Sequence, residues 1–90
     1  MEQHEVKGLI IREEHSHEFP YQVEIVGDAK TVYGSGKTLS SALMRAFSVS
    51  NMFPNSRFPI YSKKELARFL FFSFHPSKNW TKAIKALEGE

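Results

Sequence analysis

Residues 34–38 read Gly-Ser-Gly-Lys-Thr, and their types and spacing suggest phosphate chemistry. In a nucleotide-binding loop of the form Gly-x-x-x-x-Gly-Lys-Thr, backbone N–H groups surround the phosphates. Lys37 would then contact phosphate and Thr38 would bind magnesium. Because Thr31 stands at the first glycine position, we expect instead a tight turn with Thr38 capping a helix. The N–H groups at that helix N-terminus leave phosphate or carboxylate binding open as an intermediate alternative.

A second candidate for chemistry is the His- and Glu-rich segment 13–18. In extended backbone, His15 and His17 would point to one side, an arrangement that zinc could use. Zinc needs about three or four protein ligands, and no further ligand stands at a fixed spacing. We therefore expect a solvated hairpin tip and no bound metal or other cofactor, with zinc binding through His15 and His17 as the alternative.

The ingredients for catalysis are few. The chain has no cysteine, no serine in a nucleophile-elbow pattern and no carboxylate pair whose spacing indicates acid and base roles. These features predict that the protein is not an enzyme.

Length and composition limit the architecture that must position these residues. Ninety residues with 41% hydrophobic content fit one globular domain, residues 1–90. No stretch approaches the roughly 20 apolar residues that a membrane span needs. With no leader-like segment and no cysteine, a cytoplasmic protein is expected.

Hydrophobic periodicity predicts an α+β fold. Strands are expected at residues 8–12, 21–26 and 30–33, followed by a helix over 39–49 with an apolar face at i, i+3, i+4 spacing. We expect these strands to form a three-stranded antiparallel meander packed on this helix, with a fourth strand at residues 58–61 as the alternative.

Two further helices are expected in the C-terminal half. A capping box at residues 62–65 predicts a helix running to about Phe74, ending before Pro76. Ser77 or Asn79 would cap a last helix, whose apolar stripe contains Trp80, Ala83, Ile84 and Leu87.

The junction at residues 34–46 resembles two known families. The glycines and Thr38, with Ala42 and Ala46, are similar to the Gly-x-Gly-x-Ser junction and following helix of double-stranded RNA-binding domains. Residues 36–43 resemble the Gly-Asp-Thr-Leu-Glu-Glu-Ala-Leu segment of HicB-type antitoxins. The likeness covers about residues 6–50 and implies a βββα core. It also implies a nucleic-acid-binding or antitoxin-like regulatory role.

Charge is distributed unevenly along the chain. Residues 1–50 contain five Lys or Arg and seven Asp or Glu, whereas residues 51–90 contain seven and three. A basic face can bind nucleic acid or an acidic protein, and it can also be an ordinary solvated helix face. The candidate phosphate contacts are Lys63, Lys64, Arg68, Lys78, Lys82 and Lys85.

The helix after Ser62 has more aromatic surface than one face can bury. Either Phe71 or Phe74 should therefore point away from the core, and Phe53 and Phe58 on the preceding connector could extend the same patch. The favoured function is a non-enzymatic interaction or inhibitor protein that uses these four residues to bind a protein partner or a second copy of itself. The alternative is nucleic-acid binding through the lysines.

Overall fold

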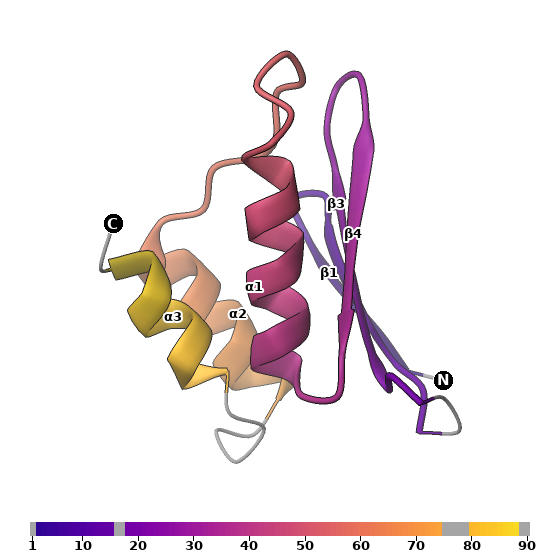
Figure 1. Cartoon of the computed structure of the whole chain (residues 1–90). Helices are drawn as coiled ribbons and strands as arrows, with labels where there is room; N and C mark the ends of the chain where they lie inside the picture. The colour runs from indigo at the N-terminus through magenta and orange to yellow at the C-terminus, as the bar shows by residue number, and fades with distance from the viewer. Residues whose placement is uncertain (1, 16–17, 75–79, 89–90) are drawn as a thin grey trace.

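The residues that the structure describes form a four-stranded antiparallel sheet and three helices, which confirms the α+β class (Figure 1). The computed structural model describes residues 2–15, 18–74 and 80–88. The sheet has the strand order β1-β2-β3-β4. The elements are β1 Glu2–Val6, β2 Leu9–Glu13, β3 Tyr21–Val26, β4 Thr31–Gly36, α1 Leu39–Ser50, α2 Lys63–Ser73 and α3 Thr81–Glu88.

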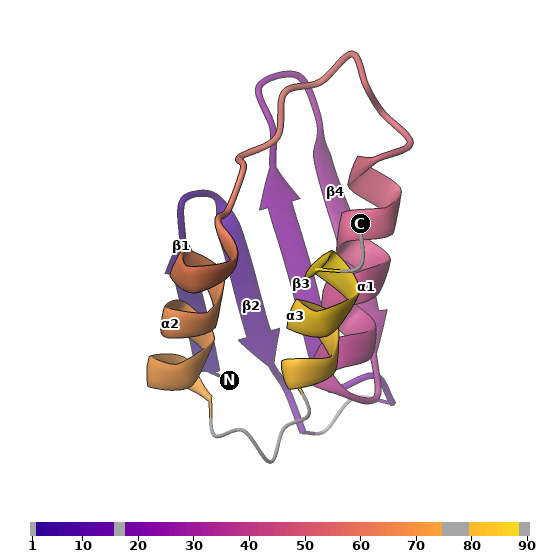
Figure 2. The same ribbon diagram turned by 90° about the vertical axis from the view of Figure 1, so that its left-hand side faces the viewer.

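All three helices lie on one face of the sheet (Figure 1). Alternation along the strands explains this arrangement, since every second residue of β2 and β3 is buried. Figure 2 shows α2 in front of β1, while α1 lies over β3 and β4. Helix α3 packs against both α1 and α2. None of the described helices covers the opposite face of the sheet.

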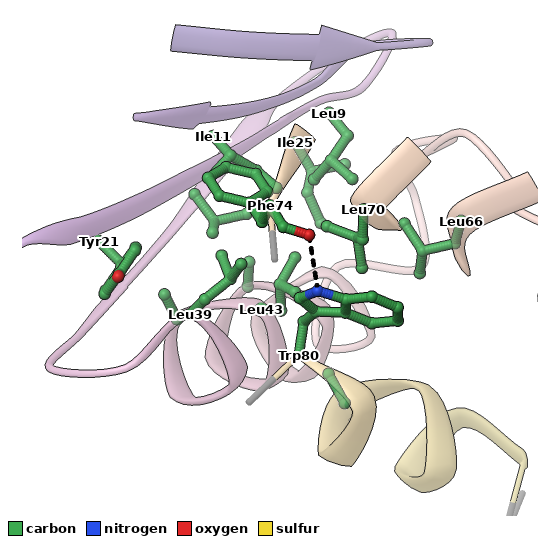
Figure 3. Packing of buried hydrophobic residues seen from close by; sticks show 14 of the residues in the cluster. Leu9, Ile11, Tyr21, Ile25, Leu39, Leu43, Leu66, Leu70, Phe74 and Trp80 are labelled. Carbon is green, nitrogen blue, oxygen red and sulfur yellow. Dashed lines mark hydrogen bonds between the residues drawn. The ribbon is translucent and has the colours of Figure 1, made fainter. Parts of the chain in front are cut away.

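The core lies between the sheet and the helices, as Figure 3 shows. Leu9, Ile11 and Ile25 enter it from the sheet, and Leu43 of α1 faces them. Trp80 closes the core beside α2, where its indole Nε1 donates a hydrogen bond to the carbonyl oxygen of Phe74 at 3.2 Å. The C-terminal helices are therefore part of the same hydrophobic core.

The fourth strand is β1 rather than the alternative at residues 58–61, and the expected three-stranded sheet is corrected accordingly. β1 consists of Glu-Gln-His-Glu-Val and has no apolar alternation. An edge strand with one hydrogen-bonded neighbour tolerates such a polar sequence. Residues 58–61 form no strand. Phe58 and Tyr61 instead pack their side chains against the core.

β4 runs through Gly34 and ends at Gly36, which corrects the prediction that the strand stops at residue 33 and that Gly34 begins a turn. A Cβ at Gly34 would lie 2.5 Å from the carbonyl oxygen of Ala42 and 2.5 Å from the amide nitrogen of Ala46. These glycines are needed because α1 packs directly against the β4 backbone. They do not form a phosphate-binding loop.

Both predicted helix starts are confirmed by their caps. Thr38 Oγ1 accepts a hydrogen bond from the Ser41 amide at 3.1 Å, and Ser62 Oγ accepts one from the Glu65 amide at 3.1 Å. The predicted third-helix residues Trp80, Ala83 and Ile84 are buried. The proposed caps Ser77 and Asn79 and the stop at Pro76 lie outside the described residues.

The connector between α1 and α2, residues 51–62, is held against the β3–β4 turn. The Asp28 amide donates to the Arg57 carbonyl at 3.1 Å, and Asp28 Oδ1 accepts from the Arg57 amide at 2.8 Å. Ser56 Oγ donates to the same carboxylate at 3.3 Å. This reciprocal set of bonds fixes the path by which the chain reaches α2.

Replacing Asp28 by alanine should weaken this attachment. The Arg57 amide and Ser56 hydroxyl lose their acceptor, so the free energy of unfolding should fall by about 1–2 kcal/mol. Urea unfolding measures this loss, and amide hydrogen exchange at Arg57 should accelerate. Asp28→Asn keeps an acceptor oxygen and should lose less; equal losses for the two variants would contradict this role.

Candidate protein-binding surface

Two adjacent aromatic side chains, Phe71 and Phe72, lie on the exposed side of α2 and contact each other. Phe71 is 64% exposed and Phe72 is 82% exposed. Their ring centroids are 6.3 Å apart in an edge-to-face arrangement. Exposing two adjacent large aromatics on an ordered helix is unfavourable in water, which is typical of a binding surface.

Phe74, the other aromatic predicted on α2, is only 5% exposed. α2 ends at Ser73, and Phe74 has extended backbone angles of φ −140° and ψ 140°. Its ring consequently turns towards the sheet and meets the His4 ring edge-on at a centroid distance of 4.8 Å. Phe74 thus belongs to the core, and Phe72, which the sequence did not single out, is exposed in its place.

The connector aromatics line a different hollow from the α2 aromatics. Phe53 and Phe58 border a pocket of about 450 Å³ beside the C-terminal end of α1, together with Pro54 and Ile60. Phe53 also lies under the Lys30 ammonium group, whose Nζ is 4.3 Å from the ring centroid. The structure therefore does not join the two predicted aromatic pairs into one patch.

A groove of about 550 Å³ runs along α2 next to β1. Its lining combines apolar and basic side chains of α2 with Glu65, two serines and one strand residue. The lining residues are Val6, Ser62, Lys64, Glu65, Arg68, Phe69, Phe72 and Ser73. Lys64, Arg68 and Phe72 stand four residues apart and so form one ridge along the helix. This spacing was visible in the sequence and is the signal that could have identified Phe72.

Contacts at the N-terminal end of α2 fix the helix beside β1. Glu65 Oε2 forms an ion pair with Lys7 Nζ at 2.7 Å. The Tyr61 hydroxyl donates to the Lys7 carbonyl at 2.6 Å and lies 3.3 Å from the Val6 carbonyl oxygen. Burial, together with the nearby Glu65 carboxylate, raises the pKa of Tyr61 from 10.0 to about 12.

Tyr61 should therefore make stability pH-dependent at high pH. The neutral phenol is favoured in the folded protein, so its contribution is complete below about pH 10 and is lost as pH rises towards 12. In an ultraviolet titration of tyrosinate absorbance, Tyr61→Phe should remove the step near pH 12. Loss of a step near pH 10 instead would contradict the assignment.

The predicted phosphate-contacting residues lie on the solvent side of the C-terminal helices. Lys63, Lys64, Arg68, Lys82 and Lys85 are exposed, and Lys78 lies outside the described residues. Within the described part of the chain, Lys64 and Arg68 form no ion pair. Their charge is consequently available to a partner.

The uncovered face of the sheet has a smaller hollow, about 290 Å³, bordered by Arg12, Glu24 and Tyr33. Arg12 is already engaged, since its NH1 nitrogen lies 3.1 Å from a Glu24 carboxylate oxygen and its Nε donates to Gln3 at 3.2 Å. The guanidinium charge is thus neutralised within the sheet. This hollow offers a weaker site for a charged ligand than the α2 groove.

Of the two histidines predicted as zinc ligands at the β2–β3 connection, His15 lies among the described residues. His15 Nε2 lies 3.0 Å from Glu13 Oε1, and the Tyr21 hydroxyl donates to the same oxygen at 3.3 Å. His17 lies outside the described residues. No cluster of three or more potential metal ligands occurs among the residues whose positions are described.

Comparisons with known proteins found no match, so the role of this surface must be inferred from its geometry. No protein-family model matches the chain, and neither the curated proteins nor the solved structures contain a match. Over the described residues, none of the helices is long and apolar enough to cross a membrane.

Proposed function

We propose that this protein is a non-enzymatic interaction module that binds or inhibits a protein partner through the α2 surface, defined as Lys63, Lys64, Arg68, Phe71 and Phe72. The observation that carries the proposal is the exposure of Phe71 and Phe72, 64% and 82%, on a helix that is otherwise anchored to the core. Aromatic side chains of this kind dominate the energetics of protein interfaces.

The charges around the two aromatics indicate what the partner should present. Lys64 and Arg68 lie along the groove that ends at Phe72. An apolar patch bordered by carboxylates would satisfy both the rings and the cations. Complementary charge at the rim would mainly raise the association rate and the specificity of binding.

Affinity capture from cells of the source organism tests the proposal. The wild type and an Ile60→Ser control should retain the same partner, since Ile60 is 90% exposed but lies on the connector. Phe71→Ser combined with Phe72→Ser should lose that partner. The free energy of unfolding should stay close to that of the wild type, because both side chains are already exposed. Equal capture by the double variant would refute the proposal.

A nucleic-acid backbone is the second candidate partner, favoured by the exposure of Lys64, Arg68, Lys82 and Lys85 across α2 and α3. This alternative includes an antitoxin-like regulator. Binding of duplex DNA or RNA would then weaken steeply with salt, with a slope of about −0.9 per neutralised phosphate in duplex DNA. Lys82→Glu with Lys85→Glu should reduce it, whereas the Phe71 and Phe72 changes should have little effect. Absence of binding at low salt would reject this candidate.

A further inference from the structure

β1 has one edge that is not paired within the sheet, and the hairpin geometry identifies the residues that face outward. Lys7 and Gly8 have φ values of 45° and 80°, as a two-residue type I′ turn requires. The flanking pair, Val6 and Leu9, is then hydrogen-bonded. Since bonding alternates along the strand, Gln3 and Glu5 direct their N–H and C=O groups away from β2.

Helix α2 lies over the helix-covered face of β1 and runs antiparallel to this edge strand (Figure 2). Its first turn is tied to the end of the strand, where Glu65 pairs with Lys7 at 2.7 Å. Its C-terminal end lies near the middle of the strand, where the Phe74 and His4 rings are 4.8 Å apart. The α2 groove, to which β1 contributes Val6, therefore lies on the helix-covered side of the strand whose outer edge Gln3 and Glu5 expose.

The ridge along α2 has nearly the spacing of a β-strand. Four helical residues rise about 6 Å, and two strand residues rise about 6.6–6.8 Å. Along a strand added to β1, three successive side chains on the helix-facing side would thus meet Lys64, Arg68 and Phe72 in turn. Lys64 and Arg68 form no ion pair within the described residues, so two of these side chains should be acidic.

We propose that the partner contributes an extended segment with the pattern acidic-x-acidic-x-apolar, which pairs antiparallel with β1 and fills the α2 groove. This inference rests on the proposed function and specifies how the partner is recognised. Backbone hydrogen bonds to Gln3 and Glu5 supply affinity, and alternate side chains supply specificity, as in other cases of strand addition. The antiparallel direction places the N-terminal acidic residue beside Lys64.

The test uses the whole protein and a blocked peptide whose residues are Thr, Glu, Thr, Glu, Thr, Leu and Thr in order. Glu5→Pro removes an outward N–H, a change that edge strands tolerate, and should weaken binding about tenfold or more. Glu5→Ala removes the same side chain but keeps the N–H, and should bind like the wild type. Equal affinity of the Pro and Ala variants would overturn the proposal.

A second measurement needs no variant and so remains decisive if Glu5→Pro fails to fold. In the wild-type protein, saturating peptide should slow amide hydrogen exchange at Gln3 and Glu5. Unchanged exchange at both amides, or no saturable binding of the peptide, would overturn strand addition.

Charge reversal tests the predicted pattern. A peptide with Lys in place of both Glu residues should bind the wild type about tenfold more weakly. It should bind better to a Lys64→Glu, Arg68→Glu variant. Equal affinity of the two peptides, or tighter binding of a peptide with the order of its residues reversed, would overturn the stated pattern and direction.

The remaining outcomes separate this proposal from the proposed function. If the Phe71 and Phe72 variant loses its cellular partner but Glu5→Pro retains it, strand addition is wrong and the α2 surface stands. If both variants retain it, both proposals fail. A dimer by light scattering that Glu5→Pro dissociates, without peptide binding, would make a second copy the occupant and overturn the acidic segment.

Discussion

Replacing Gly34 by alanine is expected to lower the free energy of unfolding by about 3 kcal/mol, the upper part of the usual cost of overpacking. A Cβ there would lie 2.5 Å from two backbone atoms of α1, the Ala42 oxygen and the Ala46 nitrogen. Backbone atoms cannot rotate away as a side chain can. The helix would have to move off β4, and the packing of Leu43 and Ala46 would loosen.

Chemical unfolding of Gly34→Ala measures this loss directly. Ser35→Ala is the matched control, because Ser35 is the next residue of β4 and its side chain points to the opposite face of the sheet. That control should change stability by no more than about 0.5 kcal/mol. A Gly34→Ala protein as stable as the control would show that α1 is not in direct contact with the β4 backbone.

Replacing Trp80 by alanine is expected to have an effect of similar size, about 3–5 kcal/mol. Trp80 is 6% exposed and fills the space beside Leu66 and Leu70 of α2 (Figure 3). Its loss would leave a cavity and an unpaired Phe74 carbonyl. Because α3 has eight residues, it should not persist as a helix without this packing.

Urea unfolding and far-ultraviolet circular dichroism together test the role of Trp80. The alanine variant should lose both stability and helical signal. Trp80→Phe keeps most of the buried ring but not the indole N–H, so it should lose about 1–2 kcal/mol and retain the helix. Full helical signal in Trp80→Ala would show that α3 is held by other contacts.

Much of the fold was predictable because local rules agree with the tertiary structure in those segments. β3 alternates strictly, and the apolar face of α1 recurs at helical spacing from Leu39 to Ala46. The caps at Thr38 and Ser62 also follow from residue type alone. In these segments, one periodicity or one side chain determines the local structure.

The features that were not predicted depend on contacts distant in sequence. β1 has no apolar face of its own and is identified by its pairing with β2. The burial of Phe74 was not predicted because helical periodicity stops applying once the chain leaves the helix after Ser73. Likewise, the need for glycine at positions 34 and 36 depends on how closely α1 approaches β4. A single sequence contains no direct signal for that approach.

Site-specific photo-crosslinking tests the central claim, that the α2 surface binds a protein partner. A photoreactive phenylalanine analogue placed at Phe72 should crosslink one protein in cells of the source organism, and the same analogue at Ile60 should not crosslink it. Both positions are highly exposed, at 82% and 90%, so exposure alone cannot account for a difference. Identical products from the two positions, or none from position 72, would contradict the claim.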